Sequence, residues 1–142
     1  MSLEAKRISI LKTDIPSGVH VLTISDVKLH KKSNGDVILH EDNPAVIVSF
    51  ENGGKLHQEL FWIGSTNYTK LQKIIIQVGL DPAMQINKKE IVGKQIYGLI
   101  KEIKTMRGSE CIKSEFVLSY TYSITDLPPD NLETVEFKQE GF

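Results

Sequence analysis

Cysteine is almost absent from this chain of 142 residues, in which Cys111 is the only one. A single thiol cannot form an internal disulfide, and no paired Cys-x-x-Cys spacing typical of a zinc site occurs. The sequence also lacks an N-terminal export signal and an apolar run of about 18 residues, which a membrane helix needs. We therefore expect a soluble, cytoplasmic protein with no membrane partner.

Catalytic motifs are missing as well. None of the four histidines has the spaced partner of a metal site, and Gly53-Gly54 lacks the lysine and hydroxyl residue of a phosphate-binding loop. A magnesium-dependent nuclease needs clustered carboxylates, but the candidates are expected at turns or on solvent-facing strand positions. These candidates are Asp26, Asp36, Glu41, Asp42, Glu51 and Glu59. We therefore expect neither an enzyme nor a cofactor, and a nuclease is the least favoured alternative.

Charge is unevenly divided along the chain, although its net value is only −1. Residues 123–142 contain five acidic residues and one basic residue, Lys138, a net charge of −4. Residues 1–122 contain 16 basic and 13 acidic residues, a net charge of +3. The sequence thus predicts one domain over 1–122 and an acidic tail over 123–142. Such a tail either competes with a polyanion for the domain or is simply solvated.

Five stretches have the composition and alternation of β-strands. They are residues 18–29, 45–50, 56–63, 94–104 and 111–122. The first stretch changes parity partway along, which predicts a β-bulge. Asn34-Gly35 and Asn52-Gly53 favour tight turns, because these residues tolerate positive φ angles.

One amphipathic helix is predicted between the third and fourth strands, over Thr66 to Val78. Ser65 or Thr66 can cap its start, Gly79 stands at its end, and apolar residues recur every three or four positions. A short second helix is predicted over 87–93. This order predicts a mainly β, five-stranded OB-fold-like barrel in which the first helix plugs one end. Barrels of this type commonly bind oligonucleotides or oligosaccharides.

Single-stranded nucleic acid is bound by rings that stack on bases and by cations along the phosphate path. The candidate rings are Phe61, Trp62, Tyr97, Tyr120 and Tyr122, and the candidate cations are Lys31, Lys32, Lys55, Lys94, Lys101, Lys104, Arg107 and Lys113. Each has a simpler interpretation, as a core aromatic, above all Trp62, or as a solvated lysine on a turn. Their coincidence with the predicted barrel makes binding the leading hypothesis.

Three segments carry a resemblance to a known family. They are Ser17–Ile24, with a small residue, a glycine and an apolar strand; the lone helix after Phe61-Trp62; and Ile91–Ile96 before the fourth strand. Over residues 17–122 the chain resembles the small OB-fold proteins of phages and integrated elements that are regarded as single-stranded-DNA-binding. The resemblance implies sequence-tolerant binding of exposed strands in replication or recombination. It supplies no residue signature, so the contact residues rest on the sequence pattern.

The tail combines acidic and aromatic residues, among them Phe137, Glu140 and Phe142. Such a peptide suits docking on a basic surface with an apolar pocket, here that of a replication or recombination protein. The leading hypothesis is thus a binder of single-stranded DNA, with RNA as an alternative ligand and self-association as an option. The second hypothesis is a protein-interaction module built on the same barrel.

Overall fold

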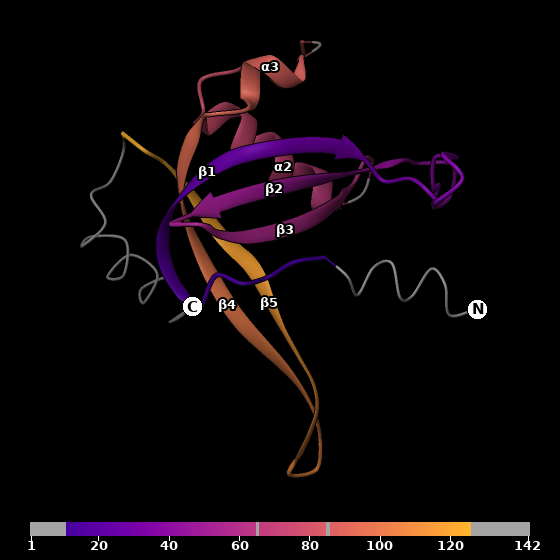
Figure 1. Ribbon diagram of the computed structural model, residues 1–142, viewed down its shortest axis with the longest axis vertical. Coiled ribbons are helices and arrows are strands. Elements are labelled where there is room, and N and C mark those ends of the chain that lie inside the picture. The colour runs from indigo at the N-terminus through magenta and orange to yellow at the C-terminus, as the bar shows by residue number, and fades with distance from the viewer. Residues whose placement is uncertain (1–10, 65, 85, 126–142) are drawn as a thin grey trace.

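The computed structural model describes residues 11–64, 66–84 and 86–125 (Figure 1). Its elements are β1 (Gly18–Leu29), β2 (Ala45–Asn52), β3 (Lys55–Trp62), α2 (Thr66–Gln77), α3 (Lys88–Ile91), β4 (Gln95–Arg107) and β5 (Glu110–Ser123). The predicted order of strands and helices is confirmed. Two predicted turn residues behave as expected, since Gly35 has a φ of 97° and Gly79, which follows α2, has a φ of 87°.

The strands form one antiparallel sheet of five strands in the order β3-β2-β1-β4-β5. β1 pairs with β4 through its first half and with β2 through its second half. A register shift between Ile24 and Asp26 marks the predicted bulge. The extra residue reverses the facing of the side chains that follow it. Val27 therefore packs against the core, and Lys28 is exposed.

The predicted OB-fold-like barrel is not confirmed, because β3 and β5 remain the two edges of the sheet. Part of the β3 edge is occupied by residues 12–14 instead. The Gln58 amide donates to the Lys12 carbonyl, and the Asp14 amide donates to the Leu56 carbonyl, each at 2.7 Å. These bonds occupy backbone groups that a neighbouring strand would need. The sheet is therefore curved but open between β3 and β5.

The core lies inside this curved sheet, and α2 covers it on the side of β3 and β5. Its largest fully buried side chains include Phe50, Phe61 and Leu118. The chain is tightest at Gly98, where a Cβ atom would lie 2.5 Å from Leu22 Cδ1 and 2.8 Å from Leu118 Cδ1. A glycine is required there because two buried leucines occupy the space beside the backbone.

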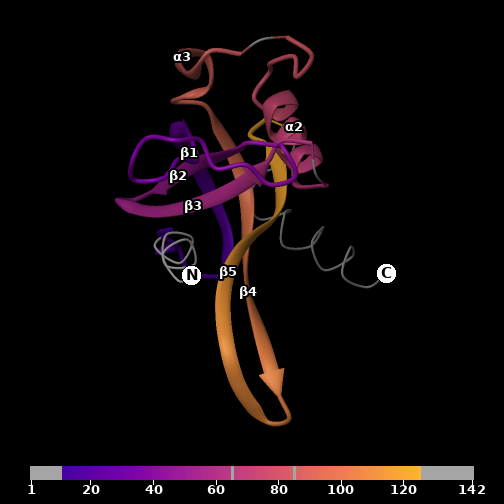
Figure 2. The same cartoon turned by 90° about the vertical axis from the view of Figure 1, so that its right-hand side faces the viewer.

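β4 and β5 extend beyond the core as a two-stranded arm, which we define as residues 102–115. Figures 1 and 2 show the arm projecting away from the end of the molecule that carries α2 and α3. Every residue of the arm is exposed. Its pairing continues to Arg107 and Glu110, a few residues beyond the predicted strand ends. The arm is thus an extended surface with no core of its own.

Candidate nucleic-acid interface

The outer face of β1, β2 and β3 combines apolar and polar groups suited to a ligand. Cross-strand pairing places Lys28, Ile47 and Leu60 in one row, with Ser49 and Gln58 in the next. Alternation of side chains along each strand sends their neighbours into the core. This face therefore carries a lysine and an amide next to aliphatic side chains.

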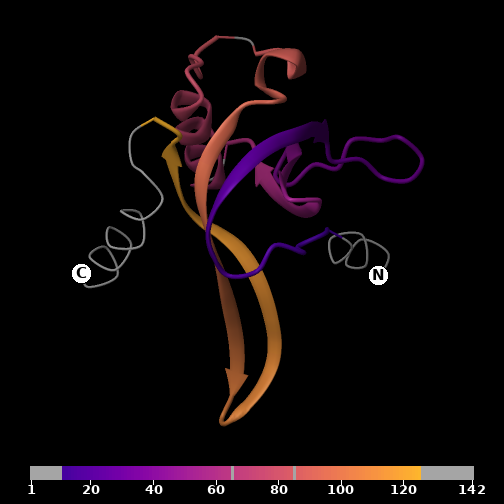
Figure 3. The same cartoon turned by 60° about the vertical axis from the view of Figure 1, so that its left-hand side comes forward.

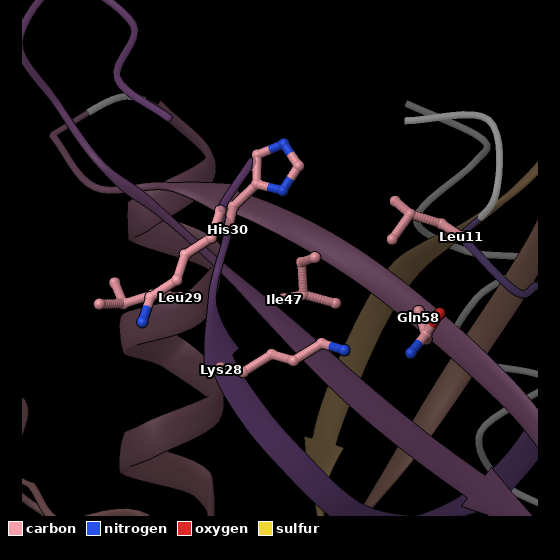
Figure 4. A pocket seen from close by; sticks show the side chains of 7 residues that line it. Leu11, Lys28, Leu29, His30, Ile47 and Gln58 are labelled. Carbon is pink, nitrogen blue, oxygen red and sulfur yellow. The ribbon is translucent and has the colours of Figure 1, made fainter. Parts of the chain in front are cut away.

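A pocket of about 520 Å³ opens on this face. Figure 4 shows the Lys28 side chain extending along the face towards Gln58, with Ile47 beside both. Ile47 is only 8% exposed and supplies an apolar wall. The lining residues are Leu11, Lys28, Leu29, His30, Lys31, Ile47 and Gln58. A few polar groups over an apolar surface are typical of ligand sites, and here the cations suit an anion such as phosphate.

Trp62 stands at the end of β3, next to two histidines of the β1–β2 connection. The His30 ring meets the indole edge-on, with centroids 6.0 Å apart, and the His40 ring is tilted against it at 5.6 Å. His30 is buried, whereas the His40 side chain is 69% exposed. We expected Trp62 above all others to be a core residue. It is instead half-buried, on the outward-facing parity of β3.

The β1–β2 loop is held by its own backbone hydrogen bonds. The Ile38 amide donates to the His30 carbonyl at 3.0 Å, and the Lys32 amide donates to the Asp36 carbonyl at 2.7 Å. Lys31 pairs with Val37 as an isolated bridge. Figure 3 shows this loop and the arm projecting from the sheet in different directions. The loop thus fixes the backbone that carries Lys31 and Lys32 beside the pocket.

The other predicted rings do not join Trp62 on this face. Phe61 is fully buried in the core and Tyr97 is 9% exposed, so the interpretation of these two rings as ligand contacts is corrected. Tyr120 and Tyr122 are half-buried on β5, where their rings stack with centroids 6.3 Å apart. The Lys73 ammonium group lies 5.6 Å from the centre of the Tyr120 ring. The tyrosine pair is therefore a separate, partly covered surface.

The predicted cations do not form one patch. They lie on the β1–β2 loop (Lys31, Lys32), at the β2–β3 turn (Lys55), before β4 (Lys94), at the base of the arm (Lys101) and along the arm (Lys104, Arg107, Lys113). On the arm, three carboxylates offset the three cations: Glu102, Glu110 and Glu115. The Lys113 ammonium group lies 3.5 Å from the Glu115 carboxylate. Of the predicted cations, only Lys31 lines the pocket on this face, and Lys32 follows it on the β1–β2 loop.

Sequence reasoning missed Lys28, His30, His40 and Gln58 at this site. The parity change in β1 was the available indication for Lys28, because it predicts a bulge that reverses the facing of the side chains after it. Nothing in the sequence indicated that His30 and His40 meet at Trp62, because that contact depends on how the loop folds back. Lys28 adds a cation and His40 an exposed ring to the face, whereas the Gln58 amide already bonds Lys12 and Ser49.

Glu59 was expected to face solvent, and this expectation is wrong. Its parity on β3 is that of His57 and Phe61, and its side chain is 12% exposed. His57 Nε2 donates to Oε1 at 2.6 Å, the Leu118 amide donates to the same atom at 3.2 Å, and Lys70 Nζ donates to Oε2 at 3.1 Å. Burial raises the pKa of Glu59, but the His57, Lys70 and Leu118 donors outweigh it and hold that pKa below its usual value.

A second carboxylate fastens α3 to the sheet. Asp26 accepts a hydrogen bond from Lys88 Nζ at 2.5 Å, which holds the pKa of Asp26 below its ordinary value. In the parts of the chain that the structure describes, no group of three or more His, Cys, Asp and Glu side chains is arranged to hold a metal ion. Cys111 is exposed on the arm. Both carboxylates therefore have structural partners.

The last predicted features are the docking residues of the acidic tail and the absence of a membrane helix. The tail residues Phe137, Glu140 and Phe142 lie outside the described residues. Within the described residues, no helix is long and apolar enough to cross a bilayer. No protein-family model matches the chain, and no curated protein matches its sequence.

Proposed function

We propose that this protein binds single-stranded nucleic acid, DNA foremost, across the outer face of β1, β2 and β3. The observation that carries the proposal is the position of Trp62 and exposed His40 beside a pocket with Lys28 and a loop with Lys31. Rings accept bases by stacking, at roughly 1 to 3 kcal/mol per base, and lysines attract the phosphates between them. This chemistry does not select particular bases.

The strand arrangement supports an OB-fold-like description of this site. OB-folds are partly open, five-stranded barrels that bind oligonucleotides on strands 2 and 3, between the loop that joins strands 1 and 2 and the loop that joins strands 4 and 5. The proposed face lies on β2 and β3, next to the β1–β2 loop. The β4–β5 arm corresponds in chain order to the second loop, but its cations Lys104 and Arg107 lie apart from the Trp62 face. We propose a cytoplasmic, non-catalytic role in replication or recombination, on the basis of the resemblance described above.

The test is a fluorescence-anisotropy titration of labelled oligo-dT, mixed-sequence single strands and duplex at low and moderate salt. We expect tighter binding to single strands, weakening with salt as bound phosphates release counterions. Lys31→Ala should weaken binding and lower the salt slope by about 0.7, the value for one single-strand phosphate contact. Lys94→Ala removes the same charge away from the pocket, so it is the matched control. Absent binding, or equal effects of the two variants, would contradict the proposal.

One observation favours the second candidate, a protein-interaction module. The arm exposes the apolar residues Ile103, Met106 and Ile112 at 48%, 50% and 52%. Apolar side chains on a protruding hairpin favour a protein partner over phosphates. A partner recovered from a lysate that survives nuclease treatment, together with no oligonucleotide binding, would favour this candidate.

A further inference from the structure

The outer edge of β5 along the arm is available for pairing. β5 is an edge strand of the sheet, bonded to β4 alone among the named strands. Within the described residues, none pairs with its other edge between Glu110 and Phe116. A free strand edge presents unpaired N–H and C=O groups, and proteins commonly protect such edges. This edge is instead long and carries exposed Ile112.

The direction of the backbone groups on this edge follows from Leu118. Its amide donates to the Glu59 side chain at 3.2 Å, so it points away from β4. Amide direction alternates along an antiparallel strand, and the β4–β5 register is unbroken from Leu118 to Lys113. The amides and carbonyls of Phe116 and Ser114 therefore also point out from the free edge. Ser114 lies at the middle of the exposed stretch.

Charges and apolar groups around Ser114 are self-complementary. If a twofold axis passes beside Ser114, Lys113 of one copy faces Glu115 of the second copy, and this pair occurs twice. Ile112, which is left unpaired by the register shift next to Lys113, lies near Phe116 of the second copy. Moving the axis by one residue places Lys113 or Glu115 opposite its own copy, and like charges opposite each other destabilise a strand pair.

We propose that two copies of this chain pair antiparallel through their β5 edges, with the twofold axis at Ser114. The outward groups of Ser114 then bond across the axis, and the outward groups of Phe116 are available on either side of it, which continues the sheet from one copy into the other. Phe116 packs against the core, and exposed Ile112 of the second copy lies next to it. A lone two-stranded hairpin is marginally stable in water, whereas a four-stranded arm buries more surface. The inference does not depend on nucleic-acid binding.

The first test is a charge swap, measured by sedimentation equilibrium of the full chain over a wide concentration range. Lys113→Glu and Glu115→Lys each create two like-charge pairs, so each should weaken dimerisation by about tenfold or more. The double variant restores opposite charges and should regain most of the affinity. A wild-type chain that stays monomeric, or a dimer that both single variants leave unchanged, would overturn the proposal. A monomer whose Lys113→Glu variant loses affinity for oligo-dT would also overturn it, and would assign this edge to nucleic acid.

The second test fixes the register by disulfide trapping. In a Cys111→Ser background, Ser114→Cys places two thiols opposite each other at the axis, where a hydrogen-bonded antiparallel pair has Cα atoms about 5.5 Å apart, within disulfide range. Mild oxidation should give a covalent dimer rapidly. Glu110→Cys in the same background is the control, because its two copies would lie far apart at opposite ends of the paired stretch. Equal rates of cross-linking for the two variants would overturn the proposed register.

Discussion

Glu59 occupies the gap between the two edge strands, where a backbone ladder would otherwise close the sheet. Its carboxylate reaches β5 at Leu118 and α2 at Lys70, and it holds the His57 ring within β3. The His57 side chain is fully buried, so this hydrogen bond orients a ring that has no water around it. One residue thus links β3, β5 and α2, and its loss removes the contacts that hold these three elements together.

Replacing Glu59 tests this link. Glu59→Gln keeps the shape of the side chain but removes its charge and leaves Lys70 without a counter-charge, so we expect a loss of roughly 2 to 4 kcal/mol in the free energy of unfolding. Urea unfolding at neutral pH measures it. Glu51→Gln, at an exposed carboxylate, is the control and should change the free energy of unfolding by less than about 0.5 kcal/mol. Equal losses in the two variants would refute the role of Glu59.

The same carboxylate predicts how stability depends on pH. The pKa of Glu59 is lower in the folded protein than its ordinary value of 4.5. Its contribution is therefore fully present above about pH 4.5 and is lost as the pH falls through the lower folded pKa. The free energies of unfolding of wild type and Glu59→Gln should converge in that acidic range. A difference that stays constant from neutral to acidic pH would contradict the assignment.

Gly98 gives a packing prediction at the scale of one methyl group. Gly98→Ala forces a Cβ atom against Leu22 and Leu118, both fully buried, so we expect a loss of about 1 to 3 kcal/mol. Thermal or urea unfolding measures it. In a Leu22→Ala background the nearer clash is gone, and the same substitution should cost less. Equal costs in the two backgrounds would show that the strain lies elsewhere.

At the scale of elements, the sequence predicted which segments are strands, but it did not always predict which face of the sheet a side chain occupies. The alternation in 18–29 indicated both the strand and its bulge. Without the bulge's position, however, Lys28 cannot be assigned to the outer face, since one extra residue reverses every later side chain. Both strands of the arm were predicted, but the first was predicted to end at residue 104 and the second to begin at residue 111, because a strand with two solvated faces lacks the apolar alternation that marks its ends.

The end of β3 gives a prediction about ligand binding. His40 is exposed beside Trp62, so His40→Ala should remove a stacking surface and weaken single-strand binding by about 1 kcal/mol, or about fivefold. Trp62 is the only tryptophan, so quenching of its emission by oligo-dT reports on this site directly. His20→Ala is the control, because His20 bonds the Pro16 carbonyl at 2.8 Å away from this face. Unchanged affinity with His40→Ala would place the ligand elsewhere.

At the scale of the whole molecule, the proposed binding of a polyanion depends on the balance between the +3 charge of residues 1–122 and the −4 charge of residues 123–142. Removing residues 126–142 changes the net charge from −1 to +3 and leaves every described strand and helix in place. We expect the shortened chain to bind oligo-dT about two- to tenfold more tightly at low salt, with the gain shrinking as salt screens the charges. Anisotropy titrations of both chains measure this. Equal or weaker binding by the shortened chain would exclude the tail as a competitor.

By itself, the sequence determined the number and order of the strands, the capped helix and the turns, because these depend on periodicity and on residues with special backbone preferences. Only the tertiary structure decided that the sheet stays open, that Glu59 is buried between β3 and β5, and that Trp62 faces outwards while Phe61 is buried. The reason is that these outcomes are contacts between distant segments. Residues 12–14 bond to backbone groups of β3 that a closing strand would need, and the folded loop brings His40 to Trp62. No local pattern encodes either contact.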